Sequence, residues 1–198
     1  MSTAMFDIIS QAAKEPAAVK LPAKDAIAQL QALLDEGANI NALDKYGGTP
    51  LIAACMENQP RIATFLLKQG ADVTVLDTVD GRSALHYAAK FAQHPLVKKL
   101  IAEGADVNSV DKEGLTPLSM LCIGARDIFD IRNARVTNSK GEEIKDDPRV
   151  LAIQRQHAKV MNTAKTLIKS GADVSLNPHK HPPLFVAGQS GHVDLIEL

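Results

Sequence analysis

The stretch DKYGGTPLIAA at residues 44–54 joins a turn to the start of a helix, and the chain nearly repeats it as DKEGLTPL at 111–118. Residues 44–47 have the composition of a tight turn, in which glycine readily takes a positive φ. Thr49 is placed to cap a helix, and Pro50 suits the first helical position, where its missing N–H costs no hydrogen bond. A second copy of this phrase indicates that the chain is built from repeats.

Two independent markers give the length of the repeat. The triplet Gly-Ala-Asp or Gly-Ala-Asn recurs at spacings of 33, 34 and 67 residues, with its glycines at Gly37, Gly70, Gly104 and Gly171. The leucine of the Thr-Pro-Leu phrase recurs at spacings of 34, 33 and 66 residues, at Leu51, Leu85, Leu118 and Leu184. Both spacings double at the last step. A period of this length is typical of solenoids, in which each unit buries its apolar face against its neighbours.

Each period predicts a turn followed by two helices. Residues 51–56 are small and apolar, as in a short, closely packed helix. Residues 61–68 predict a second helix, which Gly70 ends as the residue after the C-cap. One such pair of helices cannot bury its own apolar face, so neighbouring pairs must stack.

The pattern D-x-x-G-x-T-P-L-H-x-A, followed by Leu-Leu and then G-A-D-V-N, resembles the ankyrin repeat family. The copy at 78–110 departs from the pattern, since Ser83-Ala84 replaces Thr-Pro and one extra residue lies near Asp77. The first copy keeps only its second helix, at 24–36. The resemblance implies an all-α solenoid of about five helix-turn-helix units with β-turn tips. We expect one domain over 1–198, with an N-terminal helix and first repeat at 1–43, repeats at 44–77, 78–110 and 111–176, and a truncated repeat at 177–198.

The fourth repeat is longer than its neighbours. From Leu118 to Gly171 is 53 residues, against 19 in each of the two preceding units, so we expect an insertion at about 123–150 between its two helices. Residues 135–145 resemble two short strands around a turn, and 148–169 predict an uninterrupted helix of about 20 residues that projects from the stack. The insertion is either a tolerated surface loop or a recognition finger, and both interpretations stay open.

The last repeat stops at Leu198 inside its second helix, and its residues IEL do not form a polar cap. We therefore expect further structure downstream, or loss of a capping segment. This keeps a second function open, in which the chain is the targeting part of a longer enzyme or of a bacterial effector whose catalytic domain lies beyond residue 198.

Composition argues against several classes of function. The net charge is −1, from 22 basic and 23 acidic residues, so we expect no binding to nucleic acid. No apolar run approaches the ~18–20 residues of a membrane span, and the N-terminus does not resemble a secretion signal. Cys55 and Cys122 lie in apolar segments, which favours core positions in a reducing compartment. We expect the cytoplasm or, for an effector, the host cell interior.

We expect no catalytic residues, no cofactor and no metal. The sequence has no G-x-S-x-G, no P-loop and no H-E-x-x-H. His86 occupies the position of the family's own histidine, whose role is structural. His179, His181 and His192 fit a turn rich in histidine and proline rather than a metal site.

The resulting prediction is a monomeric protein–protein interaction module that acts as an adaptor, scaffold or targeting domain. The resemblance implies that its partner lies against a concave face made of the tips and the first helices. Candidate partner-binding residues at the tips are Lys45, Tyr46, Val79, Asp80, Arg82, Lys112, Glu113 and Leu115. Those on the first helices are Met56, Glu57, Lys90, Phe91 and Gln189, and those in the insertion are Arg135, Lys140 and Glu142. Tyr46, Met56 and Phe91 are candidates for an apolar anchor. The alternative is that Met56 and Phe91 fill gaps between stacked helices.

One asparagine is a candidate for modification. Asn108 follows Leu100 by eight residues, Asp106 by two and Val107 by one. This is similar to the asparagine that a 2-oxoglutarate-dependent hydroxylase modifies in many ankyrin repeats. The alternative is that Asn108 is simply a turn residue whose side chain bonds the backbone.

Overall fold

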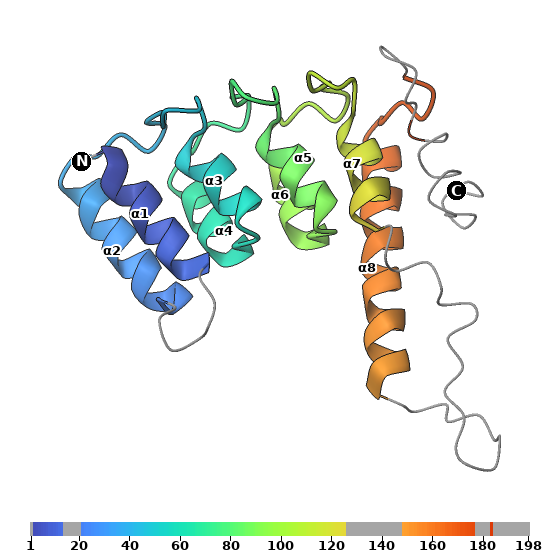
Figure 1. Cartoon of the computed structure of the whole chain (residues 1–198), viewed down its shortest axis with the longest axis horizontal. Coiled ribbons are helices and arrows are strands. Elements are labelled where there is room, and N and C mark those ends of the chain that lie inside the picture. The colour runs from blue at the N-terminus through green and yellow to red at the C-terminus, as the bar shows by residue number, and fades with distance from the viewer. Residues whose placement is uncertain (1, 14–20, 126–147, 177–182, 184–198) are drawn as a thin grey trace.

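The computed structural model describes residues 2–13, 21–125, 148–176 and 183. Within these residues the secondary structure is helical, with an isolated antiparallel bridge between Leu76 and Ser83. Figure 1 shows the helices arranged side by side along one axis. In chain order they are α1 (Ser2–Ala13), α2 (Ala23–Asp35), α3 (Pro50–Met56), α4 (Pro60–Lys68), α5 (Ala84–Lys90), α6 (His94–Ala102), α7 (Pro117–Gly124) and α8 (Pro148–Lys169).

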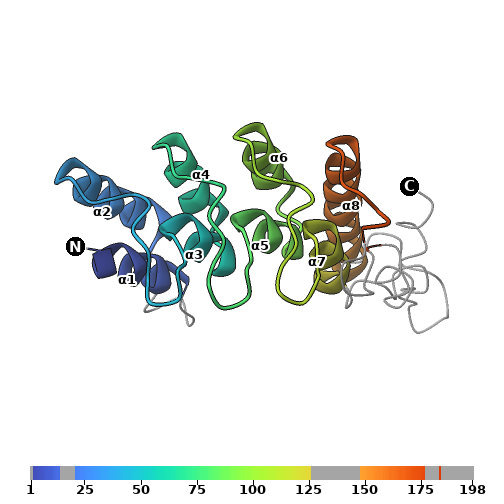
Figure 2. The same ribbon diagram turned by 90° about the horizontal axis from the view of Figure 1, so that it is seen from above.

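The helices form two rows that run along the stack. Figure 2 shows an inner row of α1, α3, α5 and α7 and an outer row of α2, α4, α6 and α8. Each inner helix packs against an outer helix, and neighbours within each row also touch. The segments between the pairs project on the side of the inner row, and together with that row they form the concave face (Figure 2). The prediction of an all-α solenoid of helix pairs is confirmed.

The inner helices begin as the repeated phrase predicts. The Thr49 hydroxyl accepts a hydrogen bond from the backbone N–H of Ile52 at 3.3 Å, and Pro50 occupies the first turn. Thr116 caps α7 in the same way. Ser83 takes this role in α5, so the loss of the Thr-Pro phrase there does not remove the cap.

Three tips connect the units by main-chain hydrogen bonds. We define the first tip as residues 44–48, the second as 77–82 and the third as 111–115. The N–H of Thr78 donates to the carbonyl of Tyr46 at 2.8 Å, which joins the first tip to the second. The N–H of Lys112 donates to the carbonyl of Asp80 at the same distance, which joins the second tip to the third. The tips therefore form a continuous wall above the inner helices.

The expanded unit keeps its place in the stack. α8 packs against both α6 and α7, as the second helix of a unit should. The predicted uninterrupted helix at 148–169 is confirmed, with 22 residues against nine in each of α4 and α6. Figure 1 shows that α8 therefore extends well beyond the lower ends of the other helices. The suggested strands at 135–145 and nearly all of the last repeat lie outside the described residues.

The N-terminal segment contains the expected helix, α1, although the repeated phrase does not occur there. α1 packs on both α2 and α3. Its buried side chains include Met5, Ile9 and Ala12. The first helix pair is thus present within the described residues, although only its second helix carries the sequence pattern of the later units.

Candidate functional site

A pocket on the concave face lies between the first two tips. We call it the concave pocket, and its volume is about 240 Å³. A hollow of this size has room for a large side chain. It is lined by Asp44, Tyr46, Gly48, Ile52, Ala53, Met56, Asp77, Val79, Asp80 and Tyr87.

The walls of the concave pocket are apolar side chains that remain in contact with solvent. Tyr46 is 52% exposed, Met56 47% and Val79 56%. Ile52 and Tyr87 are buried beneath them and line the same pocket. Single exposed apolar residues are common on protein surfaces and need no explanation. Three large apolar side chains grouped around one hollow are instead typical of interaction sites.

The polar groups of the concave pocket are carboxylates. Asp44, Asp77 and Asp80 line it, whereas its lining includes neither lysine nor arginine. Asp44 Oδ1 accepts the backbone N–H groups of Tyr46 and Gly48, each at 2.8 Å, so the carboxylate also shapes its own tip. The pocket therefore combines an apolar interior with carboxylates, of which Asp80 is paired with Arg82.

Tyr87 joins the inner helix to the second tip. Its hydroxyl donates to Asp77 Oδ2 at 3.1 Å. Burial, together with the nearby Asp77 carboxylate, raises the pKa of Tyr87 to about 12, so the phenol stays protonated. Asp77 also accepts the N–H of Asp80 at 2.7 Å. These bonds hold the wall and the floor of the concave pocket in one arrangement.

Arg82 links the second tip to the third. Its guanidinium lies 2.9 Å from Asp80, 2.8 Å from Asp111 and 3.5 Å from Glu113. The Asp111 side chain is fully buried, and its other oxygen accepts the N–H groups of Glu113 and Leu115. Arg82 is thus mainly a connector between tips, although its side chain keeps 14% exposure.

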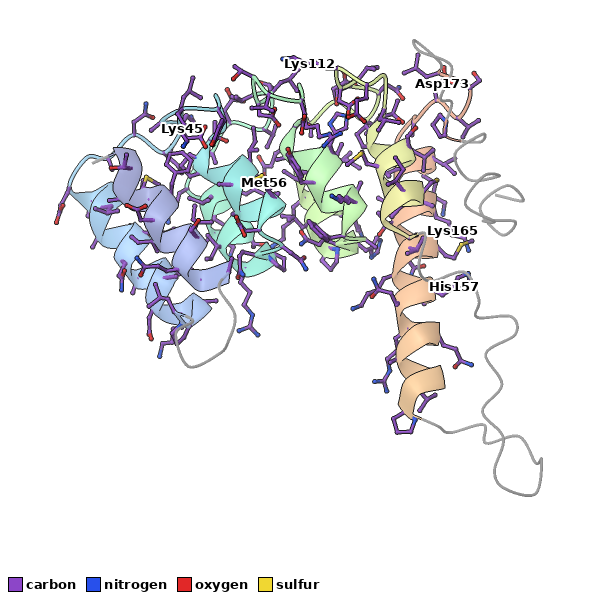
Figure 3. The ribbon with its side chains drawn as sticks, viewed as in Figure 1. Lys45, Met56, Lys112, His157, Lys165 and Asp173 are labelled. Carbon is purple, nitrogen blue, oxygen red and sulfur yellow. The ribbon has the colours of Figure 1, made fainter. Side chains whose placement is uncertain are left out.

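The remaining tip candidates lie along the upper rim. Figure 3 shows Lys45 and Lys112 on the tips, with Met56 below them on α3. The Lys45 ammonium lies 4.8 Å from the centre of the Tyr46 ring, within the range of a cation–π contact. The Lys112 ammonium donates to the carbonyl of Thr78. Both lysines therefore have contacts within the wall while remaining exposed.

Two candidates lie elsewhere than the sequence suggested. Leu115 is only 6% exposed, because the chain turns inward after Gly114, so its side chain does not belong to the tip surface. Phe91 follows the last residue of α5 and lines a second hollow at the lower end of the stack. The expected grouping of Phe91 with Tyr46 and Met56 is therefore wrong.

Two of the other candidates lie at the ends of inner helices, and four lie outside the described residues. Glu57 follows the last residue of α3 and is half-buried. Lys90 ends α5, with its ammonium 5.8 Å from the Phe91 ring centre. The candidates of the insertion and of the last repeat, Arg135, Lys140, Glu142 and Gln189, lie outside the described residues.

Sequence reasoning missed six residues of the concave pocket. These are Asp44, Gly48, Ile52, Ala53, Asp77 and Tyr87. Asp44 and Asp77 begin successive tips, and residues at equivalent positions of successive units lie on the same side of the stack. Aligning the tips as well as the helices would therefore have placed both carboxylates at one site.

His86 and the cysteines have the structural roles predicted for them. The His86 ring is fully buried, with Nε2 3.1 Å from the carbonyl of Leu115 in the next unit. Burial raises the pKa of both the Cys55 and the Cys122 thiol to about 12. Buried thiols of this kind are poor nucleophiles at neutral pH.

Asn108 bridges two units in its present state. Its side-chain amide donates to the carbonyl of Gly171 at 2.9 Å, and its side-chain oxygen accepts the N–H of Asp173 at 2.7 Å. The turn-residue interpretation accounts for these bonds. Hydroxylation of Asn108 stays a prediction.

Neither a membrane span nor a metal cluster occurs in the described part of the chain. None of the helices in ranges 2–13, 21–125 and 148–176 is long and apolar enough to cross a membrane. The same ranges contain no cluster of three or more histidine, cysteine, aspartate or glutamate side chains suited to a metal ion.

Comparison with known proteins identifies the family. The family model described as "Ankyrin repeats (3 copies)" matches residues 17–77 and 69–131, which together span more than half of the chain. The chain belongs to the ankyrin repeat family. Ankyrin repeats are protein–protein interaction modules, so the concave pocket is to be considered as a surface for a protein.

Individual relatives share the repeats over part of their length. Human B-cell lymphoma 3 protein is 29% identical over 176 residues, which cover 83% of this chain and 37% of the relative. The E3 ubiquitin-protein ligase KEG of Arabidopsis thaliana is 35% identical over 112 residues, covering 55% of this chain and 7% of the relative. Mouse ankyrin repeat and SOCS box protein 6 is 38% identical over 88 residues, covering 43% and 21%. The chain thus spans well under half of the length of each of these relatives.

Proposed function

We propose that this protein is a recognition module that binds a segment of another protein in the concave pocket. The observation that carries the proposal is the grouping of exposed Tyr46, Met56 and Val79 around one hollow. Aromatic and methionine side chains at the centre of a contact surface contribute much of the binding free energy. The module acts as an adaptor, scaffold or targeting domain and carries no chemistry of its own.

The partner segment has one large apolar side chain flanked by lysine or arginine. The apolar side chain displaces water from the hollow between Tyr46 and Val79, where apolar surface lies on both sides. The basic residue lies beside Asp44, whose carboxylate accepts backbone N–H groups, whereas Asp80 already pairs with Arg82. Complementary charge of this kind contributes more to specificity and association rate than to affinity.

A displayed library of random dodecapeptides tests this proposal, because it samples many partner sequences at once. The wild type is compared with Met56→Lys, which places a cation and a polar end in the pocket. Ala102→Lys is the matched control, since it adds the same charge at an exposed position of α6 outside the pocket. We expect the wild type and the control to enrich peptides with an apolar residue beside lysine or arginine. Met56→Lys should bind a selected peptide at least about tenfold more weakly, which is ~1.4 kcal/mol.

Two results would overturn the proposal. One is that the wild type enriches no peptides of this class. The other is that Met56→Lys retains them with unchanged affinity. Circular dichroism and thermal unfolding of all three proteins establish that the comparison is between folded chains.

The insertion provides the alternative recognition element. Arg135, Lys140 and Glu142 lie in it, and a loop of this length in a compact domain often has a function. A variant in which a short Gly-Ser link replaces residues 126–147 enters the same selection. If this variant loses peptides that Met56→Lys keeps, recognition belongs to the insertion rather than to the concave pocket.

A wider role in a longer protein is the alternative at the level of the whole chain. The Arabidopsis relative is named as a ubiquitin ligase, and its matched stretch is a small part of its length. The chain would then be the targeting part of an enzyme or of a bacterial effector. The complete reading frame of the gene decides this, since a catalytic motif downstream would support it and a polar capping repeat would not.

Compartment and oligomeric state are part of the same proposal. The two buried free thiols suit a reducing compartment such as the cytoplasm. The near-neutral net charge favours a protein partner over nucleic acid. We expect a monomer, which light scattering coupled to size-exclusion chromatography measures directly.

A further inference from the structure

A second hollow lies at the lower end of the stack, away from the concave pocket. We call it the lower cleft, and its volume is about 550 Å³. Its lining comes from the turn before α4 and the N-terminal half of α4, the turn before α6 and the first turn of α6, and one side of α8. The polar and aromatic side chains of the lining include Asn58, Phe91, Gln93, Gln156, Lys159 and Asn162.

The lower cleft exists because α8 is longer than the other outer helices. α4 and α6 have nine residues each, and α8 has 22. Figure 1 shows the extra length of α8 descending past the lower end of α6. Gln156, Lys159 and Asn162 lie on this helix and form one side of the cleft. Gln156 and Lys159 precede the last nine residues of α8, which correspond to α4 and α6, so a regular nine-residue helix would not supply them.

The other side of the cleft is held by two tight turns. Asn58 has a φ of 52° and Ala92 a φ of 49°, so each turn passes through the left-handed region before the next helix. The Gln93 side-chain amide donates to the Asn58 side-chain oxygen, which joins the two turns. His94 is held against α8 by its Nε2, 3.0 Å from the Thr166 hydroxyl. The cleft is therefore built by bonds between three units.

The charge of the lower cleft is opposite to that of the concave pocket. Its lining includes the exposed Lys159 and no carboxylate. α4 and α6 both begin at the cleft, at Pro60 and His94, and the N-terminal end of a helix carries partial positive charge. The hollow thus favours an anionic group.

The neutral groups of the cleft suit a polypeptide main chain. Four carboxamides line it, those of Asn58, Gln93, Gln156 and Asn162. A carboxamide has both a donor and an acceptor, which matches the N–H and C=O of a peptide group. Phe91 adds an apolar surface that is half-buried in the free protein.

We propose that the lower cleft is a second binding site, which takes an acidic peptide segment of a partner protein. A glutamate or aspartate of the segment lies beside Lys159, and an apolar neighbour packs on Phe91. The carboxamides of α8 bond the main chain of the segment. This site is independent of the concave pocket, whose predicted partner segment is basic.

The test uses charge reversal on α8. Lys159→Glu reverses the charge in the cleft, and Lys165→Glu is the matched control on the same helix. Both lysines are exposed, and Lys165 lies on the side of α8 that faces away from α6 (Figure 3). Dodecapeptide libraries are selected in parallel against the wild type and both variants. One enriched acidic peptide is then measured by fluorescence anisotropy, with 10 mM inorganic phosphate as competitor.

We expect the wild type and Lys165→Glu to enrich acidic peptides and Lys159→Glu to lose them. The affinity for the measured peptide should fall about tenfold with Lys159→Glu and less than twofold with Lys165→Glu. The proposal is overturned if no acidic peptide is enriched, if both variants weaken binding equally, or if phosphate displaces the peptide. The effect of Met56→Lys on basic peptides is measured separately, so the proposals for the concave pocket and for the lower cleft are tested independently.

Discussion

His86 connects two units through a single neutral imidazole ring. Its Nδ1 accepts the N–H of Ser83 at 3.1 Å, which leaves Nε2 to donate to the carbonyl of Leu115. Protonation would put a hydrogen on Nδ1 and remove the acceptor from Ser83. The ring therefore supports the cap of α5 and the third tip only in its neutral form.

The stability of the protein should depend on the protonation of His86. Burial lowers the pKa of His86 below the ordinary value of 6.5, an effect that exceeds the opposing influence of the Leu115 bond and of Asp111. The unfolded chain then binds the proton more readily, so the free energy of unfolding falls as the pH drops below about 6.5. Urea unfolding at a series of pH values from 7.5 to 5.5 measures this slope.

The His86→Asn variant isolates the contribution of the ring. It should be less stable than the wild type at pH 7.5 and should lack this part of the pH dependence. An unchanged slope in the variant would mean that another group causes it.

The Asp72 and Asp173 carboxyls affect stability in a more acidic pH range than His86. Hydrogen bonds lower the pKa of both carboxyls, so their contribution to the free energy of unfolding is lost only as the pH falls below about 4.

Arg82 should contribute to stability more than its place on a tip suggests. Arg82→Ala leaves the buried Asp111 oxygen without its guanidinium partner, which should cost about 1–3 kcal/mol. Arg61→Ala, at an exposed position of α4, should change stability by less than about 0.5 kcal/mol. Chemical denaturation of both variants checks this. If both variants lose the same small amount of stability, the ion pairs of Arg82 do not contribute measurably to the free energy of unfolding.

Sequence reasoning located single residues well where their role is local. Thr49, Pro50 and the glycine that ends each outer helix were predictable, because caps and turns depend on their immediate neighbours. Leu115 and Phe91 were misplaced for a different reason. Leu115 is the last residue of the third tip and its side chain is buried, and Phe91 lies one residue beyond α5. The direction of the chain at such ends depends on contacts with the next unit, as in the bond between His86 and Leu115.

The contact between α5 and α7 depends on a glycine. A Cβ at Gly124 would overlap the carbonyl oxygen of Lys90, so the two helix ends approach as closely as a hydrogen atom allows. Gly124→Ala should therefore destabilise the protein by about 1–3 kcal/mol, the usual cost of overpacking. Thermal unfolding measures the loss.

Gly48→Ala is the control for this prediction. A Cβ there meets only the Asp44 side chain, at 3.5 Å or more, and Gly48 has no positive φ. It should be neutral or slightly stabilising, because alanine restricts the unfolded chain. If both variants unfold at the same temperature, the close approach of α5 and α7 is not a constraint.

At the level of elements, the sequence predicted the bounds of α8, whereas it predicted α1 only as an N-terminal helix within 1–43. The long helix followed from a proline at its start and a continuous run without glycine or proline. α1 carries no repeat phrase, so only its apolar residues at Met5, Ile8, Ile9 and Ala12 could have given its bounds. Their spacing is that of one helical face, which a search for periodicity detects without any motif.

At the scale of the molecule, the concave pocket and the lower cleft differ in charge and lie on different sides of the described part of the stack. The concave pocket is lined by carboxylates, and the lower cleft by a lysine and carboxamides. The repeat pattern predicted the concave face in general, because every unit contributes the same positions to it. It could not predict the lower cleft, since that depends on how far one irregular helix descends beside its neighbours.

The most direct test of recognition at the concave face is a chemical-shift map. The full chain, labelled with ¹⁵N, is titrated with the basic, apolar peptide selected by the wild type. Binding in the concave pocket predicts that the largest amide shifts fall in the first two tips and in α3 and α5, around Tyr46, Met56, Val79 and Tyr87. Shifts concentrated on the outer helices or around Phe91 and Lys159, with these four amides unchanged, would contradict it.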